Sequence, residues 1–219
     1  MDKLINSEIR LDQDKIDHRY FYRISKRIVD IIASGLGLII LSPLFLVLGI
    51  LIYTQDKGPI FYSQIRIGRN GKKFKMYKLR SMVTNADELL AKLKEKNEVE
   101  GPMFKMKDDP RITKVGKFIR KTSLDELPQL YNVFAGHMSL VGLRPPLVGE
   151  VEQYSEYDKQ RLWVTPGCTG LWQATERNSV GFHEMVELDL EYIEKSSLFF
   201  DFYLILKTIK IMVHPNGAY

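Results

Sequence analysis

Two adjacent carboxylates, Asp125 and Glu126, lie within the segment Thr122–Gln129, just before Pro128 and an apolar run. Basic residues flank the pair on both sides: Arg111, Lys114, Lys117, Arg120 and Lys121 upstream, and Arg144 downstream. Nearby positive charge favours the ionised form of a carboxyl group, so these acids are expected to stay ionised. An ionised carboxylate can ligate a divalent cation or act as a nucleophile, and basic surroundings suit a phosphate-rich substrate.

The same residues also fit a structural role. Ser123 and Glu126 have the spacing of a capping box, and Asp125 stands where the N-cap of a helix over residues 126–135 belongs. Pro128 would then lie in the first turn, with Gly136 as the C-terminal stop. The local pattern leaves capping and chemistry open, and the two are compatible, because the partial positive charge of a helix N-terminus also stabilises an anion.

Composition limits the class of protein. The chain has 219 residues, of which 45% are apolar, and this suits one folded domain with an appendage. The net charge is +5, with eight Lys or Arg and no acid between Lys57 and Ala86. Such a block predicts an anionic partner: nucleic acid, lipid headgroups or a nucleotide. The single cysteine, Cys168, excludes an intrachain disulfide and fits a reducing compartment.

Residues 31–53 contain no charged side chain. As one helix these 23 residues would be about 35 Å long, enough to cross a hydrocarbon core of about 30 Å. However, Ser42 and Pro43 stand at the middle of the run, where proline removes a backbone donor and breaks or kinks the helix. The Ser42 hydroxyl can bond a carbonyl freed there. Each half, about 17 Å long, is too short to cross alone.

Charge around this segment favours a re-entrant hairpin. Arg19, Arg23, Lys26 and Arg27 precede the apolar run, which by the positive-inside rule keeps the N-terminus cytoplasmic. A straight span would place residues 57–219, which begin with the strongest positive cluster, on the opposite side. A helix–break–helix that enters and leaves by one face removes the conflict, and we predict it over a span or a soluble core helix. Asp30, at the entry, is expected to pair with Arg27 or a nearby lysine.

The remaining chain reads as a small β-hairpin with several helices. Strands are predicted at 59–67 and 74–79 around a turn at 68–71, and helices at 84–98, 112–119, 182–195 and 197–213. The last of these is amphipathic and suits a membrane interface. Residues 165–173 read as a Gly/Pro-rich loop. The predicted fold class is α+β and helix-rich, with a polar tail at 1–18, a membrane-inserted hairpin at 19–56 and a catalytic domain at 57–219.

Several short motifs occur in a characteristic order. They are the Ser42-Pro43 break, Gly58-Pro59-Ile60-Phe61, Lys78-Leu79-Arg80-Ser81-Met82, Asp109-Pro110-Arg111-Ile112-Thr113, Thr122–Gln129, Leu143-Arg144-Pro145 and Pro166-Gly167-Cys168-Thr169-Gly170. Together, from about Tyr20 to Tyr219, they resemble the bacterial sugar transferase family, in particular its small monotopic phosphoglycosyl transferases. The chain resembles the minimal catalytic form, since 219 residues leave no room for the multi-span N-terminal region of larger relatives.

The resemblance implies transfer of a sugar 1-phosphate from a UDP-sugar to undecaprenyl phosphate, with release of UMP. This step begins the assembly of exopolysaccharide, capsule, O-antigen or glycoprotein glycans. It also implies that Asp125 is a nucleophile that forms a covalent phosphosugar intermediate, that Mg²⁺ assists, and that Asp125 and Glu126 are the metal-binding residues. Whether Glu126 ligates the metal or handles a proton is left open.

The basic residues are expected to hold substrate phosphates, and the candidates are Lys78, Arg80, Arg111, Arg120 and Arg144. The expected location is the cytoplasmic face of the bacterial inner membrane, with membrane lipids as further partners, no nucleic acid, and homo-oligomerisation left open. Two departures from the family pattern, Pro146 and Glu176, leave the donor sugar unassigned. The competing hypothesis is a non-enzymatic, membrane-anchored basic module that binds anionic lipid or nucleic acid through residues 57–80.

Overall fold

The computed structural model describes residues 9–86, 88–89, 106, 109–175 and 181–213. The chain divides into two compact units. Unit 1 comprises Met1–Leu38, Gln64–Met76 and Gln129–Tyr219, and unit 2 comprises Ile39–Ser63 and Tyr77–Pro128. The predicted helix-rich α+β class is confirmed, because most elements are helices and the described strands form two small two-stranded sheets. The predicted boundaries at residues 18 and 56 follow the membrane assignment and stay a prediction.

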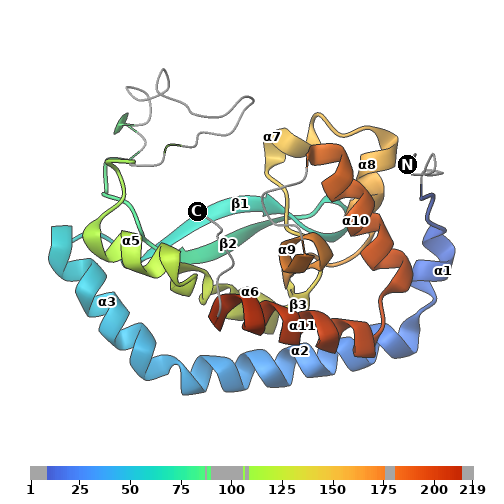
Figure 1. Ribbon diagram of the computed structural model, residues 1–219, viewed down its shortest axis with the longest axis horizontal. Helices are drawn as coiled ribbons and strands as arrows, with labels where there is room; N and C mark the ends of the chain where they lie inside the picture. Colours follow the sequence, from blue (N-terminus) through green and yellow to red (C-terminus); the bar gives the residue numbers. More distant parts are fainter. Residues whose placement is uncertain (1–8, 87, 90–105, 107–108, 176–180, 214–219) are drawn as a thin grey trace, which may run out of the picture. The chain divides into compact units, whose positions relative to one another are not determined.

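Figure 1 shows the elements in chain order. The N-terminal part has α1 (Gln13–Asp17), α2 (Tyr20–Ile40), α3 (Ser42–Asp56), β1 (Phe61–Ile67), the 3₁₀ turn η1 (Arg69–Gly71) and β2 (Lys73–Leu79). Then follow α5 (Lys114–Lys121), η3 (Leu124–Glu126), α6 (Gln129–Phe134), β3 (Ser139–Val141), α7 (Val148–Val151), α8 (Glu156–Lys159), η4 (Gln160–Trp163), β4 (Gly167–Thr169), α9 (Leu171–Thr175), α10 (Phe182–Lys195) and α11 (Leu198–Val213).

The predicted hairpin and three of the predicted helices are confirmed. β1 and β2 pair around a turn in which Asn70 and Gly71 have positive φ, the left-handed conformation that Asn and Gly adopt most readily. α10 has the predicted bounds, and α11 begins one residue later than predicted. The helix predicted at 112–119 forms as α5, two residues later, because Thr113 caps it by accepting from the Gly116 N–H. The helix predicted at 84–98 lies mostly outside the described residues.

The apolar segment is broken where Ser42 and Pro43 predicted. α2 ends at Ile40 and α3 begins at Ser42, with proline in its first turn. The Ser42 hydroxyl donates to the Ile39 carbonyl at 2.8 Å, as expected for a carbonyl freed by the break. Among the described helices, none alone has the length and apolarity to cross a membrane. The pair α2 and α3 meets the criterion jointly, with a bend of 58° at the break.

The predicted ion pair of Asp30 is wrong. Asp30 is buried on α2 and accepts a hydrogen bond from the Leu140 backbone N–H at 2.9 Å. Arg27 instead donates to the carbonyls of Val133 and Phe134 at the end of α6, and Lys26 pairs with Asp201. The carbonyls at a helix C-terminus attract a guanidinium group, and a backbone N–H can donate to a carboxylate. The partners of Arg27 and Asp30 are therefore backbone groups distant in the sequence, which residue spacing does not reveal.

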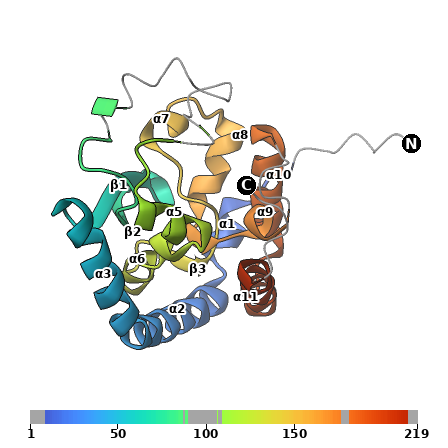
Figure 2. The same ribbon diagram turned by 60° about the vertical axis from the view of Figure 1, so that its left-hand side comes forward.

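Unit 1 contains a parallel strand pair that was not predicted. β3 and β4 pair in parallel with Ser139 opposite Gly167 and Val141 opposite Thr169. β4 lies inside residues 165–173, which were expected to form a loop. A Cβ at Gly167 would lie 2.1 Å from the Gly142 nitrogen, so only glycine allows this approach. The main core of the unit lies around these strands, where α9 packs against α10 and α11 (Figure 2).

Unit 2 is built on the second half of the apolar segment, helix α3. Leu48 and Ile52 of α3 are buried in one cluster with Leu79 of β2 and Ile119 of α5. Partly buried Leu124, next to Asp125, packs against the same cluster. The helix that follows the break is therefore part of the core that supports the carboxylate pair.

Candidate active site

The carboxylate pair lies in a 3₁₀ turn, and the capping box is absent. An N-cap residue normally has extended backbone angles, whereas Ser123 has φ 55° and ψ 17° and its side chain makes no capping hydrogen bond. Asp125 consequently lies inside η3, and the following helix α6 begins at Gln129 rather than at residue 126. The predicted C-terminal stop is confirmed, because Gly136 adopts φ +85° just beyond α6.

Asp125 is buried, with 9% of its surface exposed. Burial raises the pKa of its carboxyl group to about 6, and the charge of Glu126 adds to this, while Lys78 and Arg120 oppose it. The basic residues favour the ionised form, as expected, but loss of hydration outweighs them, so the pKa of Asp125 lies above its ordinary value. With a pKa of about 6 the carboxylate is still mostly ionised at neutral pH, which suits a nucleophile.

Glu126 differs from its neighbour in exposure and partner. Its side chain is about half exposed, and its Oε1 accepts from Lys78 Nζ at 2.6 Å. Lys78 lies on β2, next to the buried Leu79. The lysine is thus held beside Glu126 and is close enough to Asp125 to influence its pKa. The 3₁₀ turn and the end of the hairpin together bring these three charged groups into one site.

Two of the predicted phosphate-binding arginines are buried in ion pairs. Arg80 donates both terminal nitrogens to the Asp56 carboxylate at 2.5 Å each, and its Nε donates to the Pro59 carbonyl. Arg111 holds Asp109 through Nε and Nη2, at 2.9 Å and 2.6 Å for the shortest contacts, and this contact lowers the pKa of Asp109. Both guanidinium groups are therefore balanced by a carboxylate, and their contact with phosphate stays a prediction.

The other two predicted cations are exposed. Arg120 lies on α5 in unit 2 and lowers the pKa of Asp125 through its charge. Arg144 lies in unit 1, in the segment between β3 and α7. Of the seven residues predicted to act in catalysis or phosphate binding, six thus belong to unit 2, and Arg144 belongs to unit 1.

Sequence reasoning missed the acidic partners of the arginines. Asp56 ends α3 two residues before Gly58, and Asp109 stands two residues before Arg111. The second pairing was readable, since Asp-Pro-Arg places an acid and a base on either side of a turn. The first was not, because Asp56 and Arg80 are separated by the whole hairpin.

Comparison with known proteins identifies the family of this chain. The profile of the family described as bacterial sugar transferase matches residues 21–215. The chain is 48% identical over 204 residues to a galactosyl transferase CpsE of Streptococcus agalactiae, covering 92% of this chain and 45% of that protein. It is 46% identical over 201 residues to an undecaprenyl-phosphate galactose phosphotransferase of Salmonella typhimurium, covering 90% and 42%.

A shorter relative matches over most of both lengths. The exopolysaccharide production protein ExoY of Sinorhizobium fredii is 42% identical over 200 residues, which cover 90% of this chain and 88% of ExoY. The chain therefore spans less than half of the first two relatives and nearly all of the third. From the profile match and these identities, the chain belongs to the bacterial sugar transferase family.

Proposed function

We propose that this protein transfers a sugar 1-phosphate from a UDP-sugar to undecaprenyl phosphate, releases UMP, and thereby begins assembly of an exopolysaccharide or related surface glycan. The names of the relatives support the acceptor and the type of group transferred. The observation that carries the proposal is the state of Asp125, a buried carboxylate with a pKa of about 6 beside Lys78 and Glu126. Such a group is ionised at neutral pH yet poorly hydrated, and poor hydration makes an anion a better nucleophile.

The reaction divides into two displacements at one phosphorus atom. In the first, an Asp125 carboxylate oxygen attacks the phosphorus that carries the sugar. The bond from that phosphorus to the bridging oxygen breaks, and UMP leaves with the electron pair. In the second, a phosphate oxygen of undecaprenyl phosphate attacks the same phosphorus, the bond to Asp125 breaks, and the carboxylate is regenerated. Two displacements replace one difficult transfer, which is the benefit of a covalent intermediate.

The neighbouring charges suit this chemistry. Lys78 and Arg120 both favour the anionic form of Asp125, and each can interact with the diphosphate of the donor. Lys78 is held by Glu126, so its ammonium group is already positioned. In this proposal Glu126 acts mainly by positioning Lys78 and by binding the metal.

The carboxylate pair also fits Mg²⁺. Within the described residues, no group of three His, Cys, Asp or Glu side chains gathers to form a protein cage for a metal. Mg²⁺ does not require one, because it usually keeps several waters and binds through one or two carboxylates together with substrate phosphates. Asp125 and Glu126 would hold it, and the ion would supply neutralisation of the diphosphate charge.

A re-entrant placement of the membrane segment is supported by the packing of α3. One face of α3 is buried in the core of unit 2 against Leu79 and Ile119, and its last residue is bound to Arg80. A straight span would require these contacts to form within the bilayer. We therefore place the break inside the cytoplasmic leaflet of the bacterial inner membrane, with the reactive pair at the level of lipid headgroups, where the phosphate of the acceptor lies.

The non-enzymatic alternative explains fewer observations. A basic module that binds anionic surfaces would present Lys78 and Arg80 to solvent, whereas Lys78 is paired with Glu126 and Arg80 is buried against Asp56. The basic-module hypothesis also gives no role to Asp125, although burying this carboxyl group costs stability.

The test separates the two displacements. Purified protein is mixed with Mg²⁺ and UDP-galactose, UDP-glucose or UDP-N-acetylgalactosamine labelled in the sugar, without acceptor. We expect one donor to label the protein covalently and to release UMP once per active site, and undecaprenyl phosphate to remove the label. Asp125→Asn should give neither label nor turnover. UMP release by this variant above a few per cent of wild type, or no release by wild type with any donor of the panel, would refute the proposal.

A further inference from the structure

A cavity lies in unit 1, and none of the residues that line it is assigned to the chemistry above. Its volume is about 430 Å³, within the range of small-molecule sites. It is bounded by α2, by residues 136–139, by residues 163–165 and by the turn between α10 and α11. Its charged lining residues are Arg19, Arg23, Lys26, Arg27, Asp30 and Arg69.

The lining of this cavity has a surplus of positive charge. Five cations face three carboxylates: Asp30 in the lining, Asp17 beside Arg23 and Arg69, and Asp201 beside Lys26. The formal balance, five minus three, is +2. Arg19 donates to Ser196 and to the Ile193 carbonyl, and Arg27 donates to carbonyls of α6. Hydrogen bonds to neutral groups therefore orient both guanidinium groups, and among the described residues neither forms an ion pair with an acid.

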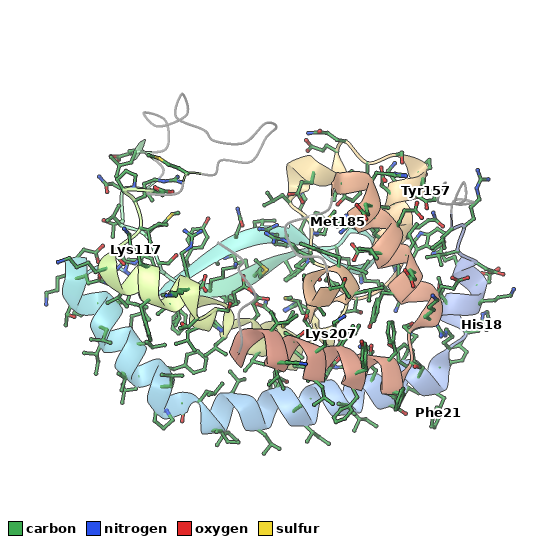
Figure 3. All side chains as sticks on the ribbon, in the orientation of Figure 1. His18, Phe21, Lys117, Tyr157, Met185 and Lys207 are labelled. Carbon is green, nitrogen blue, oxygen red and sulfur yellow. The ribbon has the colours of Figure 1, made fainter. Side chains whose placement is uncertain are left out.

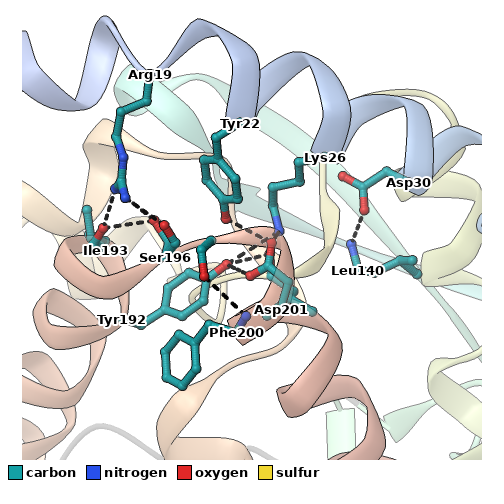
Figure 4. Close-up of polar contacts among 12 residues, drawn as sticks. Arg19, Tyr22, Lys26, Asp30, Leu140, Tyr192, Ile193, Ser196, Phe200 and Asp201 are labelled. Carbon is teal, nitrogen blue, oxygen red and sulfur yellow. Dashed lines mark hydrogen bonds and ion pairs between the residues drawn. The ribbon is translucent and has the colours of Figure 1, made fainter.

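The cationic side chains are held in place before any ligand binds. Tyr22, Lys26 and Asp30 recur at helical spacing on α2, and Arg19 immediately precedes the helix. All four side chains point towards the same side (Figure 4). Tyr22, Tyr192 and Lys26 all donate to the Asp201 carboxylate, at 2.8, 2.6 and 2.6 Å. A preorganised set of donors loses less entropy when it binds an anion.

The mouth of the cavity is apolar. Tyr20, Ile24 and Ile28 belong to its lining and are 59%, 61% and 52% exposed. They continue into an exposed apolar face of α2, where Phe21 points away from the protein (Figure 3). A ligand with an anionic head and a hydrocarbon tail would satisfy both the cations and this face. An inorganic anion would satisfy only the cations.

We infer that this cavity binds the phosphate headgroup of an anionic membrane phospholipid, such as phosphatidylglycerol, with an acyl chain along Ile24 and Ile28. The site lies where the positive flank of α2 meets its apolar run, the level at which headgroups lie in a bilayer. The bound lipid is neither donor nor acceptor. It would fix the depth of α2, and its binding is independent of the transferase reaction.

The binding test uses Trp163, which lines the cavity. In a Trp172→Phe background, Trp163 is the one remaining tryptophan of the chain. Full-length protein in neutral detergent is titrated with phosphatidylglycerol, phosphatidylcholine, a short polyprenyl phosphate and inorganic phosphate, with Trp163 fluorescence as the signal. We expect phosphatidylglycerol to bind at least ~5-fold tighter than phosphatidylcholine. Inorganic phosphate should bind weakly and compete.

Variants locate the binding in the cavity. Arg19→Gln and Arg27→Gln should each weaken phosphatidylglycerol binding ~5-fold, and Arg27→Lys should retain most of it. Lys210→Gln removes one exposed charge from α11, outside the cavity, and should change nothing. If Arg27→Gln does not fold, the phosphatidylglycerol affinities of Arg19→Gln and Arg27→Lys still test the inference. Equal affinity for the two phospholipids, tighter binding of the polyprenyl phosphate, or unaltered binding by Arg19→Gln would each overturn the inference.

Discussion

Asp125 combines two properties that oppose each other in folding and support each other in catalysis. Its burial removes hydration, so ionising it costs free energy in the folded protein. The same loss of hydration makes the carboxylate more reactive towards phosphorus. Lys78 and Arg120 limit the cost without cancelling it, since the pKa of Asp125 stays above its ordinary value. Stability is thus lost at the residue where the proposed chemistry occurs.

The first residue-level prediction concerns pH. Because burial raises the pKa of Asp125 to about 6, the nucleophile is protonated below that pH and ionised above it. The rate of covalent labelling by the donor, measured by rapid quench, should rise between pH 5 and pH 7 with a midpoint near 6. Measurements at one Mg²⁺ concentration and one ionic strength keep the metal from shifting the curve. A rate that is already constant at pH 5 would contradict the assignment of this pKa.

The second residue-level prediction concerns stability. The pKa of Asp125 is higher in the folded state than its ordinary value of 3.8, so stability is full below pH 3.8 and falls as pH rises through about 6. Asp125→Asn should therefore be more stable than wild type at pH 7.5 by up to ~3 kcal/mol, and the difference should shrink at pH 4.5. Unfolding in detergent without Mg²⁺ measures this.

Glu126→Gln is the matched control for that measurement. Its carboxylate is about half exposed and is paired with Lys78, so its removal should change the unfolding free energy by no more than ~1 kcal/mol. A destabilised Asp125→Asn at pH 7.5 would show that the buried carboxylate is stabilised by its surroundings.

At the level of elements, the ion pair between Asp56 and Arg80 joins the last residue of α3 to the residue that follows β2. Lys78 lies two residues before Arg80, and Leu79 between them is buried in the cluster that includes α3. The pair therefore fixes the strand end that presents Lys78 to Glu126. Arg80 therefore has a structural role in positioning Lys78, whereas the sequence alone suggested that Arg80 binds phosphate.

A stability measurement separates these two roles of Arg80. Arg80→Met leaves Asp56 without its bidentate partner, and because Asp56 is exposed to water we expect a loss of ~2 kcal/mol in unfolding free energy. Arg80→Lys should recover only part of it, because an ammonium group lacks the planar pair of donors. The double variant Asp56→Asn/Arg80→Met should be less destabilised than Arg80→Met alone. If Arg80 served only to bind phosphate, the stability of all three variants would match wild type.

The contact between β3 and β4 gives another prediction at this level. Gly167→Ala places a Cβ 2.1 Å from the Gly142 nitrogen, so the strands must separate, and we expect a loss of more than ~3 kcal/mol. Gly149→Ala is the control, because a Cβ there meets no atom within 4 Å and α7 favours alanine. Thermal unfolding of both variants tests the comparison, and equal melting temperatures would argue against close strand contact.

At the level of the whole molecule, the break at Ser42 and Pro43 is expected to decide on which side of the membrane residues 57–219 lie. Ser42-Pro43→Ala-Leu restores a continuous apolar helix and should convert part of the population to a straight span. A Lys72→Cys probe in a Cys168→Ala background, labelled in intact cells with a membrane-impermeant reagent, measures this. We expect the Lys72→Cys probe to stay unlabelled when Ser42 and Pro43 are present, and to be labelled in the Ser42-Pro43→Ala-Leu variant. Labelling of the unchanged break from outside would refute the re-entrant placement.

Features set by neighbouring residues were predictable. The hairpin, the broken apolar helix and α10 follow from hydrophobic period, turn residues and proline, which act within a few positions of the chain. Asp125 and Glu126 could be singled out as candidates, because two acids within a basic segment form a local pattern, and their role in the reaction stays a prediction. The false capping box shows the limit of such patterns, since the left-handed backbone of Ser123 cannot be deduced from its spacing to Glu126.

The sequence by itself therefore determined which charged residues are candidates for the site and where the apolar segment breaks. It also determined that the hairpin and α10 form. The tertiary structure decided the sign of the pKa shift of Asp125, the partners of Arg80 and Asp30, and the parallel pairing of β3 with β4. Each of these depends on burial or on contacts between residues far apart in the chain. Desolvation and long-range pairing arise only when distant segments pack together, and no local pattern encodes them.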